Sequence, residues 1–247
     1  MKKIKVGAVS YLNTKPLLYG VERSEELMQQ VELKKDYPSK IALQLLNGDI
    51  DVGLVPVAVL PKMKEYYIIT DYCIGADGDV GSVCLFSDVE LDKVEKILLD
   101  YQSKSSVALC KVLLKNFWKK DLFLENARED FTEQINGTTA AVLIGDRALK
   151  QRKISKYIYD LAGEWKKYTK LPFVFAAWIS NKELPQDFIQ LFNQKNAEGV
   201  NNIEAVIKNA TCDYYDLHNY YTHNISYELT AEKLKGMRLF LELMQQL

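Results

Sequence analysis

Five short turns in the sequence place hydroxyl, amide and glycine residues directly after apolar runs. They are Ser10-Tyr11-Leu12-Asn13-Thr14, Val55-Pro56-Val57, Gly81-Ser82, Gln102-Ser103-Lys104-Ser105-Ser106 and Gly145-Asp146. Several of these turns lead into expected helices, whose first N–H groups and positive dipole end favour a bound carboxylate or phosphate. Two such helix starts would suit a ligand with two anionic groups, so we expect the turns to line a pocket for a small anion.

The same residues also have structural interpretations. Asn13, Ser105 and Ser106 could cap helices, Ser82 could end a turn, and Asp146 could cap a helix while forming a surface ion pair with Arg147. The sequence alone does not choose between these roles and contact with a ligand.

The sequence lacks the motifs of the common catalytic machineries. It has no GxSxG, Walker or GxGxxG pattern, and its only histidines, His218 and His223, fall in the C-terminal region beside several tyrosines. We interpret these histidines and tyrosines as packing or surface residues. The four cysteines are scattered with no CxxC pair, so we expect them to be reduced and buried. We therefore expect no metal site and no organic cofactor.

Charge and hydropathy restrict the partners and the location. The chain has 247 residues, 32 basic and 33 acidic side chains and a formal net charge of -1. This balance gives no reason to expect a nucleic acid or an anionic membrane as a partner. No apolar run approaches the roughly 18 residues of a membrane span, and the first residues do not fit a secretory signal. We expect a cytoplasmic protein that binds a small molecule, and the sequence does not indicate its oligomeric state.

The apolar pattern predicts strands that alternate with helices, which is typical of parallel α/β sheets. We expect strands over residues 3–9, 31–35 and 51–55, helices over 14–19 and 39–46, and two strands around 75–81. A similar strand–turn–helix pattern fills 88–170, and the apolar strand LPFVFAAWISN follows it. Beyond that strand we expect only helices, over 185–199, 200–209, 213–221 and 230–247.

Two groups of strands predict an α/β protein with two lobes. A helical tail without strands of its own must pack on a sheet formed earlier in the chain. We therefore expect residues 1–86 and 176–247 to form lobe 1, and residues 87–175 to form lobe 2. The ligand cleft would lie between the lobes, where strand C-termini meet helix N-termini.

Several segments together resemble a known enzyme family. They are VGAVSYLNTKPL, NGDIDVGLVPVAVL, SKSSVALCKVLL, AVLIGDRAL, DLAGEWKKYTKLPFVFAAW and NISYELTAEKLKGMRLFLEL. In combination, and nearly end to end, they are similar to the chorismate dehydratases of the futalosine route to menaquinone. The resemblance implies a fold like the type II periplasmic binding proteins. It also implies an enzyme that removes water from chorismate to give 3-(1-carboxyvinyloxy)benzoate.

The resemblance further implies roles for individual residues. Asn13 and Ser82 would be catalytic, and Ser105 and Ser106 would hold a carboxylate at a helix start. The remaining candidates for substrate binding are Ser10, Tyr11, Pro56, Gly145 and Asp146. The substrate's own enolpyruvyl carboxylate would take the proton. Asp146 is the candidate if a protein carboxylate is the base instead.

Two other functions fit the same fold. A non-catalytic small-carboxylate-binding protein would carry an export signal or lipid-anchor cysteine, or a DNA-binding segment if it senses an effector, and we expect neither. The sister naphthoate synthase of the same pathway has an opening turn of the Cys-Pro-Asn-Asp type, unlike SYLNTKP here. A spectral assay with chorismate would separate an enzyme from a binder.

Overall fold

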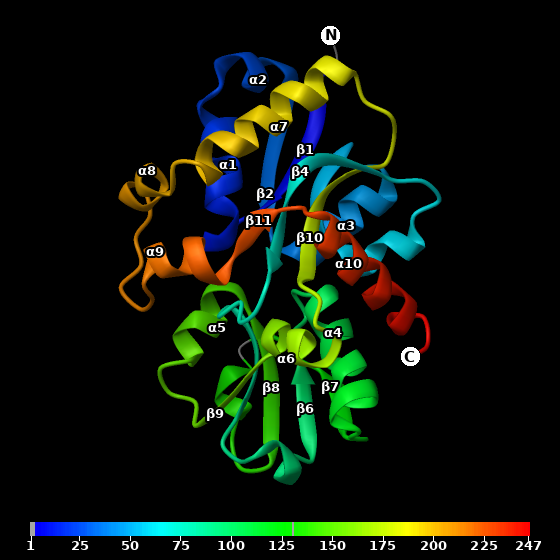
Figure 1. Cartoon of the computed structure of the whole chain (residues 1–247), viewed down its shortest axis with the longest axis vertical. Helices are drawn as coiled ribbons and strands as arrows, with labels where there is room; N and C mark the ends of the chain where they lie inside the picture. Colours follow the sequence, from blue (N-terminus) through cyan, green and yellow to red (C-terminus); the bar gives the residue numbers. More distant parts are fainter. Residues whose placement is uncertain (1–2, 130) are drawn as a thin grey trace.

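The computed structural model describes residues 3–129 and 131–247, which form two mixed sheets flanked by helices. One sheet has six strands in the order β11-β4-β10-β3-β1-β2, and the other has five in the order β7-β6-β8-β5-β9. Figure 1 shows the six-stranded sheet in the upper half and the five-stranded sheet in the lower half. We call each sheet with its helices the first lobe and the second lobe. This arrangement confirms the predicted α/β class with two lobes.

The first lobe is assembled from both ends of the chain. Its strands are β1 (Ile4–Val9), β2 (Val31–Asp36), β3 (Val52–Pro56), β4 (Tyr67–Ala76), β10 (Phe173–Ser180) and β11 (Ser226–Glu228). Its helices are α1 (Lys15–Arg23), α2 (Glu25–Gln30), α3 (Pro38–Asn47), α7 (Gln186–Val200), α8 (Ile203–Lys208), α9 (Leu217–Asn219) and α10 (Ala231–Met244). Short 3-10 helices cover Leu12–Thr14 and Val57–Lys62, and a π-helix covers Tyr220–Asn224. The last helix, α10 (red in Figure 1), packs on β10 and also reaches the second lobe.

The second lobe is built from the middle of the chain. Its strands are β5 (Val83–Ser87), β6 (Lys96–Leu99), β7 (Phe123–Asn126), β8 (Thr139–Ile144) and β9 (Tyr157–Asp160). Its helices are α4 (Ser105–Leu113), α5 (Gly145–Gln151) and α6 (Leu161–Thr169), with a π-helical turn at Leu114–Trp118 and 3-10 turns at Leu91–Lys93 and Thr132–Gln134. The sequence predicts a strand, a turn and a helix in both places, and α4 follows β6 after a short turn, whereas α5 begins directly after β8.

The sheets are mixed, so the prediction of parallel sheets is wrong for part of each. β1 pairs in parallel with β2 and β3, and β6 pairs in parallel with β7 and β8. In contrast, β10 runs antiparallel to β3 and β4, and β5 runs antiparallel to β8 and β9. Both β5 and β10 arrive from the other lobe. They therefore enter their sheet from the opposite end, which reverses their direction.

The C-terminal region contains a strand that the sequence pattern did not reveal. β11 pairs antiparallel with β4 at the edge of the sheet, so the prediction of a C-terminal tail without strands is wrong. Lys233 of α10 holds this strand, because its buried ammonium group donates to the carbonyl and the hydroxyl of Ser226 at 2.6 and 2.7 Å. A strand of three residues is too short for an alternating pattern to stand out.

Strand membership bears on where the chain crosses between the lobes. β5 begins at Val83 and belongs to the five-stranded sheet, whereas β10 begins at Phe173 and belongs to the six-stranded sheet. We propose that the crossings lie near residues 77–82 and 170–172, slightly before the boundaries expected at 86 and 175. As a division into domains, 1–86 plus 176–247 and 87–175 stays a prediction.

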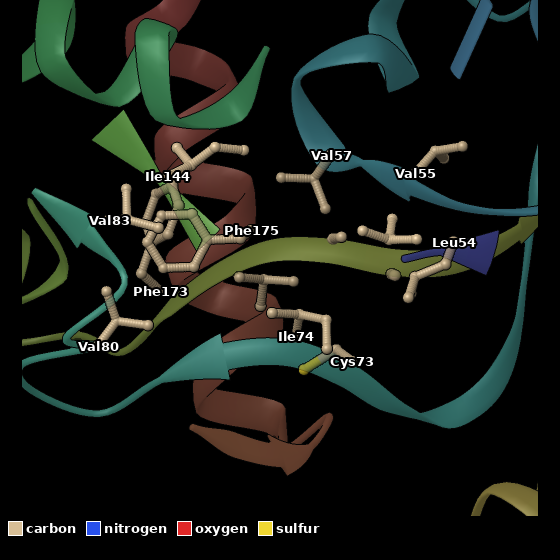
Figure 2. Close-up of a cluster of buried hydrophobic side chains, with 14 of the residues drawn as sticks. Leu54, Val55, Val57, Cys73, Ile74, Val80, Val83, Ile144, Phe173 and Phe175 are labelled. Carbon is tan, nitrogen blue, oxygen red and sulfur yellow. The ribbon is translucent and has the colours of Figure 1, made fainter. Parts of the chain in front are cut away.

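An apolar core continues from one lobe into the other. A single cluster of buried side chains contains residues of both sheets, and Figure 2 shows part of it around β10. Phe173 and Phe175 of β10 lie close to Val83 and Ile144 of the second lobe in this view. Trp165 of α6 packs edge-on against Phe173, with the ring centroids 5.5 Å apart. The apolar core therefore joins the two lobes next to the space between the sheets.

Three further features of the described residues concern the cysteines, the helices and the side chains that could bind a metal ion. All four cysteines are free, and Cys73, Cys84 and Cys110 are buried as predicted, whereas Cys212 is partly exposed. No helix in the described part of the chain is both long and apolar enough to cross a membrane. Within residues 3–129 and 131–247, no three His, Cys, Asp or Glu side chains gather as they would around a metal ion.

Candidate active site

A cavity lies between the two lobes, with about 490 Å³ of empty space that includes a part open to solvent. Its lining consists of Val9, Tyr11, Asn13, Thr14, Pro38, Pro56, Ile74, Val80, Ser82, Val83, Ser103, Ser105, Ser106, Ile144, Gly145, Phe175 and Ala176. Every polar side chain in this lining is an uncharged hydroxyl or amide. The cavity can therefore surround a small molecule with apolar walls and offer it hydrogen bonds from neutral groups.

The cavity brings together most of the site residues predicted from sequence. Tyr11, Asn13, Pro56, Ser82, Ser105, Ser106 and Gly145 line it, whereas Ser10 and Asp146 do not. Asn13 of the first lobe and Ser106 of the second lobe thus share one space. Ser10 is exposed, and its backbone N–H donates to the carbonyl of Asp36 at 3.2 Å. Ser10 therefore extends the pairing of β1 with β2 instead of facing the cavity.

Asn13 lies in the 3-10 helix between β1 and α1, and its side chain caps neither helix. Its Oδ1 accepts a hydrogen bond from the Thr14 hydroxyl at 3.2 Å. Its backbone carbonyl accepts one from the hydroxyl of the buried Tyr227 at 2.9 Å. Among the described residues, no group accepts a hydrogen bond from the Asn13 amide nitrogen. This nitrogen is therefore available to donate to a ligand.

Ser82 directly precedes β5 and is 0% exposed. Its Oγ accepts a hydrogen bond from the Tyr220 hydroxyl at 2.7 Å, and its carbonyl accepts one from the N–H of Gly145 at 2.8 Å. The preceding Gly81 has a φ of 75°, a left-handed conformation that glycine adopts without strain. This turn places the Ser82 side chain at the cavity and away from the protein surface.

Helix α4 begins at Ser105, and its first turn faces the cavity. Ser105 Oγ accepts the N–H of Ala58 from the first lobe at 3.1 Å. Ser103 Oγ accepts the N–H of Ser106 at 3.1 Å, so Ser103 supplies a hydroxyl acceptor to the first turn. The N–H groups and positive dipole end at this helix start can hold a carboxylate.

Gly145 and Asp146 begin α5 and bring the second lobe against the first. Gly145 has a φ of 62°, and a Cβ atom at this position would lie 2.9 Å from the ring of Tyr11. A glycine is therefore required here on both backbone and steric grounds. Asp146 is partly buried, and its Oδ1 accepts the N–H of Leu12 at 3.1 Å. Burial raises the pKa of the Asp146 carboxyl, and the Leu12 hydrogen bond opposes that rise.

Charged residues lie beside the cavity and outside its lining. Arg147 donates from Nη2 to both carboxylate oxygens of Asp100 at 2.8 Å and to Gln102 Oε1 at 2.9 Å. Gln102 Oε1 also accepts the Tyr11 hydroxyl, which connects this ion pair to the first lobe. Burial raises the pKa of Asp100 although Arg147 opposes the rise. Because Arg147 pairs with Asp100, the expected surface ion pair between Asp146 and Arg147 does not form.

Hydrogen bonds between the lobes hold the two walls of the cavity together. They run from Ser39 N–H to the Gln102 carbonyl, from the Ser39 hydroxyl to the Tyr101 carbonyl, from Ala58 N–H to Ser105 Oγ, and from Leu12 N–H to Asp146 Oδ1, each at 3.1 Å. The donors all belong to the first lobe and the acceptors all belong to the second. The structure is therefore that of the two lobes closed against each other.

Several residues at the site were not identified from sequence. The lining also contains Val9, Pro38, Ile74, Val80, Val83, Ile144, Phe175 and Ala176, all of which are apolar. Behind the lining, Tyr220 and Tyr227 contact Ser82 and Asn13. The dense tyrosines of the C-terminal region were the available signal for these two residues, and we interpreted them as packing. Phe175 supplies an aromatic wall from the apolar strand near residue 175.

This arrangement provides position and burial without a strong protein acid or base in the described lining. A carboxylate held against the apolar wall loses water, which raises its own basicity. The site therefore suits a reaction that depends on orienting a small anionic molecule whose own groups take part in the chemistry.

Comparison with known proteins identifies the family. The family described as menaquinone biosynthesis matches residues 4–246. The chain is 26% identical over 266 residues to a chorismate dehydratase from Thermus thermophilus, covering 98% of this chain and 95% of that protein. It is also 26% identical over 244 residues to a chorismate dehydratase from Campylobacter jejuni, covering 96% of this chain and 95% of the relative.

Solved structures show the same fold. A crystal structure of a protein from Archaeoglobus fulgidus has a TM-score of 0.79 at 15% identity, covering 99% of this chain and 97% of the other. A Candida albicans protein with the periplasmic binding protein fold has a TM-score of 0.61 at 13% identity, covering 100% and 91%. These likenesses confirm the predicted fold. Since the family match spans nearly every residue, this chain belongs to the menaquinone biosynthesis family.

Proposed function

We propose that this protein is a chorismate dehydratase, a hydro-lyase that converts chorismate to 3-(1-carboxyvinyloxy)benzoate and water. The observation that carries the proposal is the uncharged cavity in which Asn13, Ser82 and Ser106 converge from the two lobes. The names of the two relatives from Thermus thermophilus and Campylobacter jejuni support it. In this role the protein acts in the cytoplasm on a free small molecule.

The proposed substrate matches the polarity of the cavity. Chorismate has a cyclohexadiene ring, a ring carboxylate and an enolpyruvyl ether that carries a second carboxylate. The first turn of α4, with Ser105 and Ser106, can hold one carboxylate through N–H and hydroxyl donors. The Ser82 hydroxyl can donate to the other, and the apolar residues of β10 and β8 can contact the ring.

The reaction removes the proton on C3 and the hydroxyl on C4. The C3–H electron pair forms the new ring double bond, the C4–O bond breaks, and the proton and hydroxide leave as water. The ring becomes aromatic, so the reaction is strongly favourable and the protein's task is to orient the groups. The substrate's enolpyruvyl carboxylate takes the proton, and its removal from water increases its basicity.

Asn13 and Ser82 have separate roles in this mechanism. The Asn13 amide donates to the departing C4 hydroxyl, where negative charge develops as the C–O bond breaks. Ser82 donates to a carboxylate and keeps the enolpyruvyl group in the orientation that reaches C3–H. Orientation of this kind can contribute about 7–11 kcal/mol of barrier lowering in favourable cases. The same restraint disfavours the pericyclic rearrangement that chorismate undergoes in solution.

Asp146 is the alternative base, and its position argues against that role. Its Oδ1 is engaged by the Leu12 N–H at 3.1 Å, and the residue lies outside the lining of the cavity. A base must come within hydrogen-bond reach of the proton that it removes. The substrate's own carboxylate belongs to the same molecule as C3–H, so no protein group has to approach that proton.

The function is tested by incubating the purified chain with chorismate and following the ultraviolet spectrum and the mass of the products. We expect the cyclohexadiene absorption to disappear and the mass to fall by one water molecule as the benzoate forms. An unchanged spectrum, with calorimetry showing that chorismate binds, would instead identify a non-catalytic binding protein. An unchanged spectrum without binding would reject chorismate as the ligand.

A further inference from the structure

Tyr220 lies directly behind one of the proposed catalytic residues. It begins the π-helix Tyr220–Asn224, and its side chain is 0% exposed. Its hydroxyl lies 2.7 Å from Ser82 Oγ, although 138 positions separate the two residues in the sequence. The contact joins the C-terminal region of the first lobe to the residue that directly precedes the first strand of the second lobe. A π-helical turn is a feature often found at functional sites.

The direction of this hydrogen bond follows from what each hydroxyl can reach. Within the described residues, Ser82 Oγ is the one hydrogen-bond partner of the Tyr220 hydroxyl. A buried O–H group without an acceptor costs roughly 1–3 kcal/mol, so Tyr220 donates and Ser82 accepts. Burial raises the pKa of Tyr220 well above its usual value, which keeps the phenol protonated. The hydrogen of the Ser82 hydroxyl is then free to point into the cavity that Ser82 lines.

The segment that carries Tyr220 is fixed to the chain that carries Ser82. Asn224 Nδ2, at the end of the π-helix, donates to the carbonyl of Asp79 at 3.0 Å. Asn224 Oδ1 accepts the hydroxyl of Tyr215 at 3.1 Å. The ring of Tyr215 packs edge-on against that of Tyr220, with centroids 5.8 Å apart. The phenol of Tyr220 is therefore held at a defined position relative to Ser82.

We propose that Tyr220 is a positioning residue for the dehydration, which orients the Ser82 hydroxyl so that its hydrogen faces the substrate. This inference rests on the proposed function. Without the Tyr220 O–H, the Ser82 hydroxyl can turn its hydrogen toward other acceptors, and it then donates to the substrate for only part of the time. Substrate binding is shared by many lining groups, whereas the orientation of the enolpyruvyl carboxylate depends on this one donor.

The test is the variant Tyr220→Phe, which keeps the buried ring and removes only the oxygen. We expect kcat to fall about tenfold while KM for chorismate stays within about twofold. In a Ser82→Ala background, the same substitution should cause no further fall in kcat, because the group that Tyr220 orients is already missing. A residue that only stabilises the fold would give independent effects in the two backgrounds.

Tyr221→Phe is the matched control. It removes a hydroxyl from the neighbouring residue of the same π-helix, and among the described residues that hydroxyl has no hydrogen-bond partner. We expect its kcat to equal that of the unaltered chain. Thermal unfolding of each variant reports whether the fold is intact.

Three outcomes would overturn the inference. An unaltered kcat in Tyr220→Phe would do so, as would equal falls with and without the Ser82 hydroxyl. If Tyr220→Phe does not fold, Ser82→Ala supplies the decisive measurement, because a kcat close to that of the unaltered chain would leave nothing for Tyr220 to orient. Failure of the unaltered chain to act on chorismate would reject the proposed function itself, and so the two kinds of failure are distinct.

Discussion

The lining of the cavity and the residues directly beside it have opposite electrostatic character. The described lining holds uncharged hydroxyls and one amide, whereas Asp100, Arg147 and Asp146 lie just outside it. A cation in the lining would bind the substrate's carboxylate tightly and lower its basicity, and an anion there would repel it. The same charges in the neighbouring layer fix the walls of the cavity. The difference teaches that the uncharged lining buries and orients the substrate, while the charged residues beside it hold the walls of the cavity in place.

The largest effect that this comparison predicts concerns the ion pair between Arg147 and Asp100. Arg147→Met leaves the Asp100 carboxylate, whose side chain is 0% exposed, without its cation. We expect the free energy of unfolding in urea to fall by about 3 kcal/mol, because an uncompensated buried charge is strongly destabilising. Adding Asp100→Asn should recover part of the loss, since a neutral amide needs no cation. A change too small to measure in Arg147→Met would show that the ion pair does not support the cavity wall.

The next effect concerns the neutral lining. Asn13→Ala removes the amide donor while leaving the backbone carbonyl that Tyr227 contacts. We expect kcat for chorismate to fall about 100-fold or more with only a modest rise in KM, because the lost interaction is strongest in the transition state. Ser10→Ala is the control from the same turn, and we expect its steady-state kinetics to be unchanged. Normal turnover by Asn13→Ala would remove Asn13 from the mechanism.

A smaller effect tests whether the charged residues beside the cavity take part in the chemistry. Asp146→Asn keeps an oxygen that can accept the Leu12 N–H, so we expect kcat within about twofold of the unaltered chain. Complete loss of activity would instead make Asp146 the base. This variant therefore distinguishes a protein carboxylate from the substrate's own carboxylate as the base.

The same variant has a predicted dependence on pH. Burial raises the pKa of Asp146 in the folded state, so the folded chain holds this proton more tightly than the unfolded chain. Stability contributed by the protonated form is therefore lost as pH rises from the usual carboxyl pKa through the raised one. Asparagine cannot ionise, so the stability of Asp146→Asn relative to the unaltered chain should increase from acidic to neutral pH. Urea unfolding at several pH values measures this, and the opposite trend would contradict the cause given for the shift.

Local signals predicted the turns of the site but not the direction in which each side chain points. The helix-starting turns at Asn13, Ser105 and Gly145 are recognisable because polar or glycine residues follow apolar strands. Ser10 belongs to the same turn as Asn13, yet it remains exposed as an extension of β1. A change of one position in extended chain reverses the face to which a side chain belongs. The sequence does not state where β1 ends to that precision.

Contacts between distant segments were beyond reach of the sequence. Tyr227 is separated from Asn13 by 214 positions, and nothing in the spacing of the tyrosines identifies such a partner. The short strand β11 and the antiparallel direction of β10 have the same origin, because both depend on how the chain returns from the second lobe. Periodicity reports which face of an element is apolar, but it does not report the segment against which that face packs.

The hydrogen bonds that join Ser39 to the 101–102 turn and Ala58 to Ser105 control when a ligand can enter or leave the cavity. They must open to admit a molecule and open again to release one. The aromatic product retains both acid groups, so the helix start that attracts the substrate also retains the product. We expect the benzoate to compete with chorismate for the site, and initial rates measured with added product should show competitive inhibition.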